Sequence, residues 1–133
     1  MTTQATRNDS LIAQLRRELQ ATNAFQKILS DQRLEVTGAA VEARALMLAA
    51  LQDATRRGIA VIVPSDAALD DFESALQLFH RDPRCVSLYP SPSLSPYQNV
   101  SPSLGVIREE IRALGMLASD GANIVVVPAR ALF

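Results

Sequence analysis

Residues 59–66 read IAVIVPSD, and this stretch decides the class of fold. Five apolar residues follow one another without alternation, which is typical of a strand covered on both faces in a parallel sheet. Pro64 ends the run, and Ser65 followed by Asp66 suits a helix start, because a serine can cap the first turn and an acid complements the helix dipole. The stretch therefore predicts a strand at residues 59–63 that leads directly into a helix.

The same alternation of strand and helix extends in both directions. Further strands are predicted at residues 33–36, 85–89 and 124–127, with helices at 10–30, 41–57 and 66–80 and a last one opening at Ser101 and Pro102. Four short strands alternating with helices indicate an α/β fold. We expect a parallel sheet of about four or more strands with helices on both faces.

The apolar stripes of these elements predict the core. The last helix should bury one face, made of Leu104, Ile107, Ile111, Leu114 and Ala118. We expect three helices and two strands to share one core. Its predicted members are Leu46, Ile62, Phe72, Ile111 and Val126.

Composition limits the classes of function. The 133 residues carry a net charge of -1, whereas nucleic-acid binders usually have a basic excess. No apolar run is long enough to cross a bilayer, and residues 1–9 lack the apolar core of a signal peptide, so we expect a cytosolic location. The single cysteine, Cys85, lies in an apolar run and is interpreted as a buried hydrophobe, not a nucleophile.

The chain divides into three parts by composition. Residues 1–9 are expected to form a flexible tail, residues 10–30 one or two N-terminal helices, and residues 31–133 an α/β domain. Because the last three residues are apolar and lack a capping signal, we expect that the chain is a piece of a longer protein, truncated at its C-terminal end.

A turn between the strand at 33–36 and the helix at 41–57 has the layout of a P-loop. In a P-loop, glycines expose backbone N–H groups to phosphate, a lysine neutralises charge and a Ser or Thr hydroxyl holds Mg²⁺. Here the turn consists of Thr37, Gly38, Ala39, Ala40, Val41 and Glu42. Val41 takes the lysine position and Glu42 the hydroxyl position, and the only lysine, Lys27, lies in the preceding helix. We interpret the turn as a degenerate P-loop with no nucleotide, metal or catalytic residue.

In order and spacing, these segments resemble the N-terminal, UvrB-like domain of bacterial transcription-repair coupling factors (Mfd). The resemblance covers about three quarters of the chain, from Leu34 onward. Its segments are the turn at 37–42, residues 61–66 (VIVPSD), residues 88–90 (LYP), residues 94–97 (LSPY), residues 100–102 (VSP) and residues 124–132 (IVVVPARAL). The family's segment has Asp after Leu-Pro-Tyr, whereas in this chain Gln98 follows Tyr97 and Ser95 precedes Pro96.

This resemblance implies a scaffold that is not an enzyme. The family's module is similar to the repair helicase UvrB without its ATPase residues, and it recruits UvrA, while other domains bind RNA polymerase and translocate on DNA with ATP. The implied partners are the remainder of the chain's own parent, UvrA through the following subdomain, and RNA polymerase and DNA through other domains, with no membrane. Leu94, Pro96 and Tyr97 are the candidate interdomain loop.

Two other functions stay open at this point. One is the nucleotide-binding domain of a P-loop ATPase or helicase with an atypical phosphate loop, which the missing lysine disfavours. The other is a DNA-contacting module built on residues 90–102. This segment holds Tyr97, with Tyr89 at its entrance, and has no basic residue, so it suits DNA poorly. A proline-stiffened connection at the sheet edge is the simpler interpretation of that loop.

Overall fold

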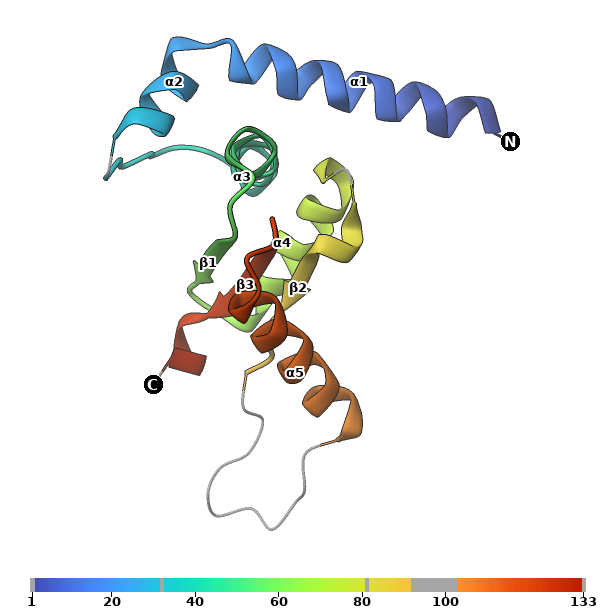
Figure 1. Ribbon diagram of the computed structural model, residues 1–133, viewed down its shortest axis with the longest axis vertical. Coiled ribbons are helices and arrows are strands. Elements are labelled where there is room, and N and C mark those ends of the chain that lie inside the picture. Colours follow the sequence, from blue (N-terminus) through green and yellow to red (C-terminus); the bar gives the residue numbers. More distant parts are fainter. Residues whose placement is uncertain (1, 32, 81, 92–102, 133) are drawn as a thin grey trace.

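The computed structural model describes residues 2–31, 33–80, 82–91 and 103–132 (Figure 1). Its centre is a parallel sheet of three strands in the order β1-β3-β2. The strands are β1 (Ile59–Val63), β2 (Val86–Leu88) and β3 (Ile124–Pro128). The register pairs Ile59 with Ile124 on one side of β3 and Val86 with Ile124 on the other, so β3 is central.

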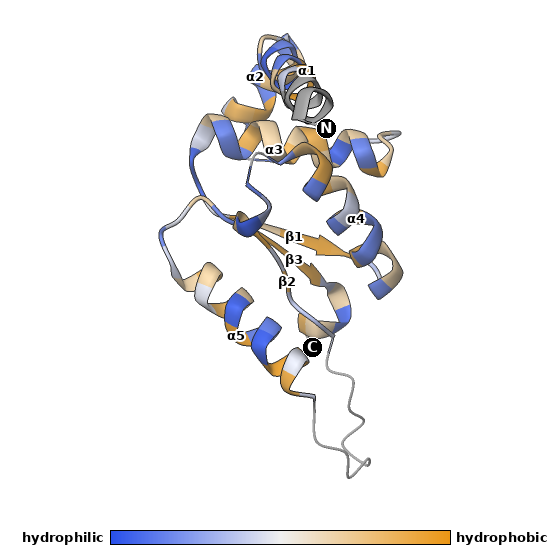
Figure 2. Ribbon diagram, turned by 90° about the vertical axis from the view of Figure 1, so that its right-hand side faces the viewer, coloured by the Kyte–Doolittle hydropathy of each residue, from blue (hydrophilic) through white to orange (hydrophobic). Residues whose placement is uncertain are grey.

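Helices cover both faces of this sheet. α3 (Val41–Thr55) and α4 (Asp66–Phe79) lie on one face, and α5 (Leu104–Ala118) lies on the other (Figure 2). α1 (Thr2–Gln20) and α2 (Asn23–Ser30) form an outer layer, with α1 packed on α3 (Figure 1). Short 3-10 turns occupy Pro83–Cys85 and Ala129–Leu132. The α/β class and the helices on both faces are therefore confirmed.

The predicted fourth strand is wrong. Residues 33–36 are irregular and exposed, and the apolar side chains of Leu34 and Val36 reach solvent. Two apolar residues alternating with Arg33 and Glu35 provide too little buried area to hold a strand against the sheet. The described sheet therefore has three strands instead of four or more, and no strand leads into the turn at residues 37–42.

Helix boundaries follow local chemistry. Ser65 caps α4 by accepting a hydrogen bond from the N–H of Ala68, as the sequence predicted. α5 has Ser103 as its N-cap, whereas the predicted cap at Ser101 lies outside the described residues. α1 begins at Thr2, so it includes residues expected to form a tail, because no proline or glycine interrupts them.

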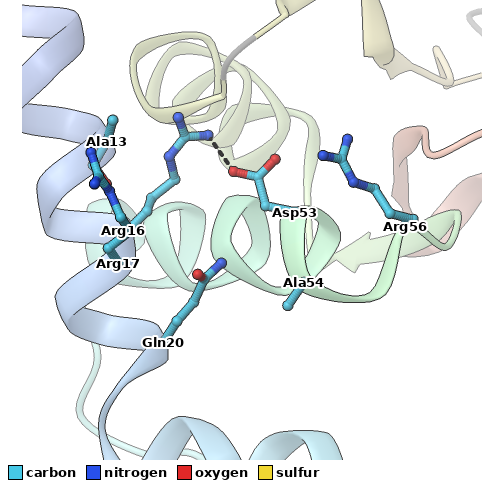
Figure 3. Close-up of a pocket in the computed structure, with 7 residues that line it drawn as sticks. All are labelled: Ala13, Arg16, Arg17, Gln20, Asp53, Ala54 and Arg56. Atoms are coloured by element: carbon cyan, nitrogen blue, oxygen red, sulfur yellow. Dashed lines mark hydrogen bonds and ion pairs between the residues drawn. The ribbon is translucent and has the colours of Figure 1, made fainter.

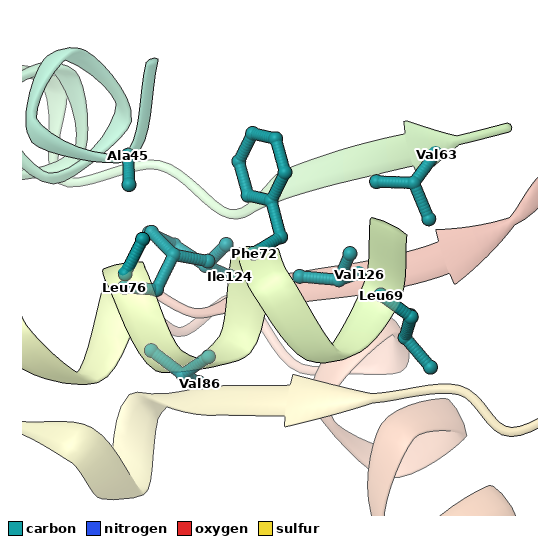
Figure 4. Packing of buried hydrophobic residues seen from close by; sticks show 9 residues of the cluster. Ala45, Val63, Leu69, Phe72, Leu76, Val86, Ile124 and Val126 are labelled. Atoms are coloured by element: carbon teal, nitrogen blue, oxygen red, sulfur yellow. The ribbon is translucent and has the colours of Figure 1, made fainter. Parts of the chain in front are cut away.

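The core consists of two hydrophobic clusters on opposite faces of β3, which is buried along its whole length. Because side chains of a strand alternate between faces, Ile124 and Val126 point toward α4 while Val125 and Val127 point toward α5. The larger cluster (Figure 4) comprises Ala45, Val63, Leu69, Phe72, Ala75, Leu76, Val86, Ile124 and Val126. The smaller cluster centres on Ala113 of α5.

The prediction of one core containing five named residues holds for two of them. Phe72 and Val126 share the larger cluster, whereas half-buried Leu46 belongs to neither cluster. Ile62 and Ile111 are 62% and 64% exposed. Ile62 is exposed because β1 is an edge strand and α5 packs on β2 and β3. One face of β1 is thus left uncovered by the described helices.

The buried face of α5 also differs from the predicted stripe. Ala113 is fully buried, and Ile107 and Met116 are half-buried, while Leu104, Ile111, Leu114 and Ala118 of the predicted stripe are exposed. A small residue at 113 allows the helix to approach β3 closely. The apolar stripe therefore points away from the sheet, which the helical periodicity alone could not reveal.

Candidate functional site

The turn at residues 37–42 lies at the N-terminus of α3. Gly38 has φ +73°, a backbone conformation that residues other than glycine rarely adopt. No atom within 4 Å would obstruct a Cβ at this position. Backbone conformation, not close packing, therefore explains this glycine. Ala40 is the N-cap and makes no side-chain hydrogen bond, and Glu42 lies in the first helical turn.

The electrostatics beside this turn disfavour phosphate. A hollow of about 440 Å³ adjoins it, lined by Val41, Glu42, Asp71, Ser74, Ala75 and Leu78. Two carboxylates and no cation are among these described lining residues. The positive end of the α3 dipole is already complemented by Glu42. The hollow can therefore accommodate a neutral or cationic group far more readily than a triphosphate.

A second cluster, missed by sequence reasoning, lies at the carboxyl edge of the sheet. Asp66 follows β1, Ser91 follows β2, and Arg130 follows β3. Nη2 of Arg130 lies 2.5 Å from Oδ2 of Asp66, and Nε of Arg130 donates to Oγ of Ser91 at 2.6 Å. Ser91 Oγ in turn donates to Oδ1 of Asp66 at 2.5 Å. We call these three residues the carboxyl-edge cluster.

A signal for this cluster exists in the sequence. All three strand segments run into a proline, at Pro64, Pro90 and Pro128, and a cluster residue follows one or two positions later. The carboxyl ends of parallel strands meet at one edge of the sheet, which is where open α/β sheets bind ligands. Recognising the repeated strand-proline pattern would have predicted that polar residues after it meet in space.

The chemistry of the cluster is structural. The Asp66 carboxylate accepts from both the Arg130 guanidinium and the Ser91 hydroxyl, and the Arg130 guanidinium also donates to the Ser91 hydroxyl. The cluster joins three loops and fixes the chain at Ser91, immediately before residues 92–102. The candidate loop residues Leu94, Pro96 and Tyr97 lie outside the described residues.

A buried polar contact joins α3 to the end of α4. The side-chain amide of Gln52 donates to the carbonyl of Ala122, and Nε2 of His80 donates to Oε1 of Gln52 at 2.8 Å. The backbone N–H of Asp82 donates to Nδ1 of His80 at 3.0 Å. His80, the C-cap of α4, is thus held on both ring nitrogens and has a structural role.

An exposed ion pair follows this histidine. Nε of Arg84 lies 3.1 Å from Oδ1 of Asp82, and the backbone N–H of Arg84 donates to the same oxygen. The side-chain hydrogen bond from Arg84, followed by the backbone hydrogen bond, lowers the pKa of Asp82 below its ordinary value. The Asp82 side chain also caps the 3-10 turn at Pro83–Cys85.

Other site types find little support. Within residues 2–31, 33–80, 82–91 and 103–132, no group of three or more His, Cys, Asp or Glu side chains is placed to hold a metal ion. Over the same residues, every helix is too short or too polar to span a membrane. Comparisons with protein-family models, with curated proteins and with solved structures gave no match.

Proposed function

We propose that this chain is a non-catalytic scaffold domain of a transcription-repair coupling factor. It belongs to the module that brings the excision-repair protein UvrA to stalled RNA polymerase in the cytoplasm. The segment order from Leu34 to Leu132 supports the family and is the observation that carries the proposal. Glu42 and Asp71 beside the turn at residues 37–42 disfavour phosphate there.

Phosphate binding at the turn would place like charges together. Glu42 lies in the first turn of α3, and Asp71 lines the adjoining hollow. A phosphate within about 4 Å of a carboxylate is repelled by about 1 kcal/mol in water and by several times that in a partly buried hollow. Val41, in place of the lysine, supplies no compensating attraction. This balance favours a scaffold over an ATPase with an atypical loop.

Exposed apolar surface supports a role in contacting other domains. A groove of about 150 Å³ separates β1 from α5 and is lined in part by Ala60, Met116 and Leu117. Ile62 on β1 and Ile111 on α5 are also exposed. Exposed apolar surface of this kind is available to a neighbouring domain. We propose that the remainder of the parent chain, including the subdomain that binds UvrA, packs here.

Calorimetric titration with ATP tests the catalytic part of the proposal. We expect no heat of binding that depends on Mg²⁺. Changing Val41→Lys together with Glu42→Thr should not create a site, because Ala40 still stands where the loop needs a second glycine to open around phosphate. Micromolar affinity that requires Mg²⁺ in the unchanged chain would overturn the proposal and favour the ATPase alternative.

Titration with UvrA tests the scaffold part. We expect the 133-residue chain to bind UvrA weakly or not at all, and a version extended by about a hundred residues of the parent, the size of one domain, to bind it tightly. In the extended version, changes at Leu94 or Tyr97 should weaken binding modestly by displacing the following subdomain. Tight binding of UvrA by the shorter chain would show that the recruiting surface lies elsewhere.

A further inference from the structure

A polar pocket lies between the N-terminal helix α1 and the C-terminal end of α3, whereas the turn at residues 37–42 lies at the N-terminus of α3 (Figure 3). Its volume is about 260 Å³. The pocket is lined by Ala13, Arg16, Arg17, Gln20, Asp53, Ala54 and Arg56. Three guanidinium groups and one carboxylate give this lining a net charge of +2. The chain as a whole has a net charge of -1, so the pocket lining is positively charged although the protein is slightly acidic.

Arg16 is the most unusual member of the lining. Its side chain is only 8% exposed, and Nη1 lies 2.8 Å from Oδ2 of Asp53. Its Nε is buried and has no hydrogen-bond partner among the described residues. A buried guanidinium normally has all its N–H groups satisfied, and an orphaned one costs about 1–3 kcal/mol or more.

Arg56 contributes a second charge from an uncommon backbone conformation. It is the C-cap of α3 with φ 54° and ψ 28°, and the left-handed conformation at this position usually belongs to glycine. The sequence predicted a helix at residues 41–57, but α3 ends at Thr55. Figure 3 shows the side chain of Arg56 on the far side of Asp53 from Arg16. Asp53 forms its ion pair with Arg16, and Arg56 lines the same pocket.

Contacts across the pocket hold α1 on α3. Besides the ion pair of Arg16 with Asp53, the side-chain amide of Gln20 donates to the carbonyl of Ala50 at 3.0 Å. Arg17 presents a third guanidinium from α1, and its Nε donates to the carbonyl of Ala13 at 3.3 Å. An anion in the pocket would contact cations from both helices. Binding would therefore strengthen the attachment of α1.

We propose that this pocket binds a small phosphate-type oxyanion, either inorganic phosphate or the phosphomonoester group of a larger metabolite. Guanidinium groups match the oxygens of phosphate in pairs, and a dianion balances the net charge of the lining. A volume of about 260 Å³ lies below the range of pockets that enclose drug-sized ligands, so the pocket holds the phosphate group itself. The site is independent of the turn at residues 37–42.

The test is a titration of the whole chain with inorganic phosphate at constant ionic strength. The chemical shifts of the backbone amides are measured by NMR at each step of the titration. We expect saturable shifts centred on α1 and the end of α3. The variants Arg17→Gln and Arg56→Asn should each weaken binding about tenfold by removing a charge-assisted hydrogen bond. Asparagine tolerates the left-handed conformation at 56, so that variant keeps the backbone. Arg57→Gln is the matched control, because Arg57 is exposed and does not line the pocket.

Further arms separate the sources of phosphate. A sugar monophosphate that shifts the same amides and binds with the same affinity as inorganic phosphate would support a phosphomonoester ligand. Tighter binding of inorganic phosphate would support the free ion. Unsaturable shifts, or equal loss in Arg57→Gln, would overturn the proposal. So would acetate binding as tightly as phosphate, or binding of a DNA oligonucleotide without binding of inorganic phosphate. Since ATP also carries a terminal phosphate, any ATP binding that disappears in Arg56→Asn and needs no Mg²⁺ belongs to this pocket and leaves the proposed function intact.

Discussion

Two leucines on α4 allow a quantitative test of the layer arrangement. Leu76 is fully buried in the cluster between α3, α4 and the sheet (Figure 4), whereas Leu78, two residues later, is 58% exposed. Leu76→Ala should destabilise the domain by about 3–5 kcal/mol, the upper part of the usual range. The neighbours Ala45, Val86 and Ile124 belong to three different elements, so they cannot all move into the void.

The matched control is Leu78→Ala, the same chemical change on the same helix. It should cost less than about 1 kcal/mol, because the side chain is already solvated and alanine favours a helix. Urea denaturation followed by far-UV circular dichroism measures both, since the chain has no tryptophan to report by fluorescence. Leu76→Ala should lower the midpoint without changing the slope. Equal effects of the two changes would refute the placement of α4 on the sheet.

Three further predictions concern polar contacts. In a double-mutant cycle, Asp66→Asn and Arg130→Gln should show a coupling of at most about 1 kcal/mol, because both side chains are about half exposed; a coupling several times larger would mean that the cluster is more rigid than its exposure implies. Gln52→Ala should lower the free energy of unfolding by about 1–3 kcal/mol, measured by urea denaturation, since it leaves a buried ring N–H and a carbonyl without partners. A neutral effect would contradict that contact. The carboxyl carbon of Asp82 should titrate by NMR below an ordinary aspartate and return toward it in Arg84→Gln. Because the folded pKa is lowered, the small stabilisation by this pair is present above the ordinary aspartate pKa and is lost as the pH falls through the folded value; an unchanged titration in the variant would exclude Arg84 as the cause.

The elements with the strongest local signals were predictable from the sequence. The uninterrupted apolar runs at residues 59–63 and 124–127 became strands, and Ser65 caps the helix that follows the first of them. The errors came from tertiary context. Residues 33–36 alternate in the manner of a strand but have no strand partner in the described structure, and Ile62 has strand chemistry but lies at an edge where α5 does not reach.

The candidate sites divide in a similar way. The chemistry of the turn at residues 37–42 depends on residue types alone, so Val41 and Glu42 were readable directly. The carboxyl-edge cluster and the pocket at α1 depend on which distant residues meet. Arg16 lies in α1 and Asp53 in α3, with α2 and two connections between these helices, and their 2.8 Å contact follows from how α1 crosses α3. No local pattern contains that information.

The edge position of β1 has a consequence for the solution behaviour of this chain. Among the described strands, β1 pairs only with β3, so its other backbone edge offers free N–H and C=O groups beside five apolar residues. Such an edge can template the addition of a strand from another molecule. Pro64 after the strand limits that growth, as proline residues do beside aggregation-prone segments. Replacing it would remove a safeguard against fibrous self-assembly without touching the folded core.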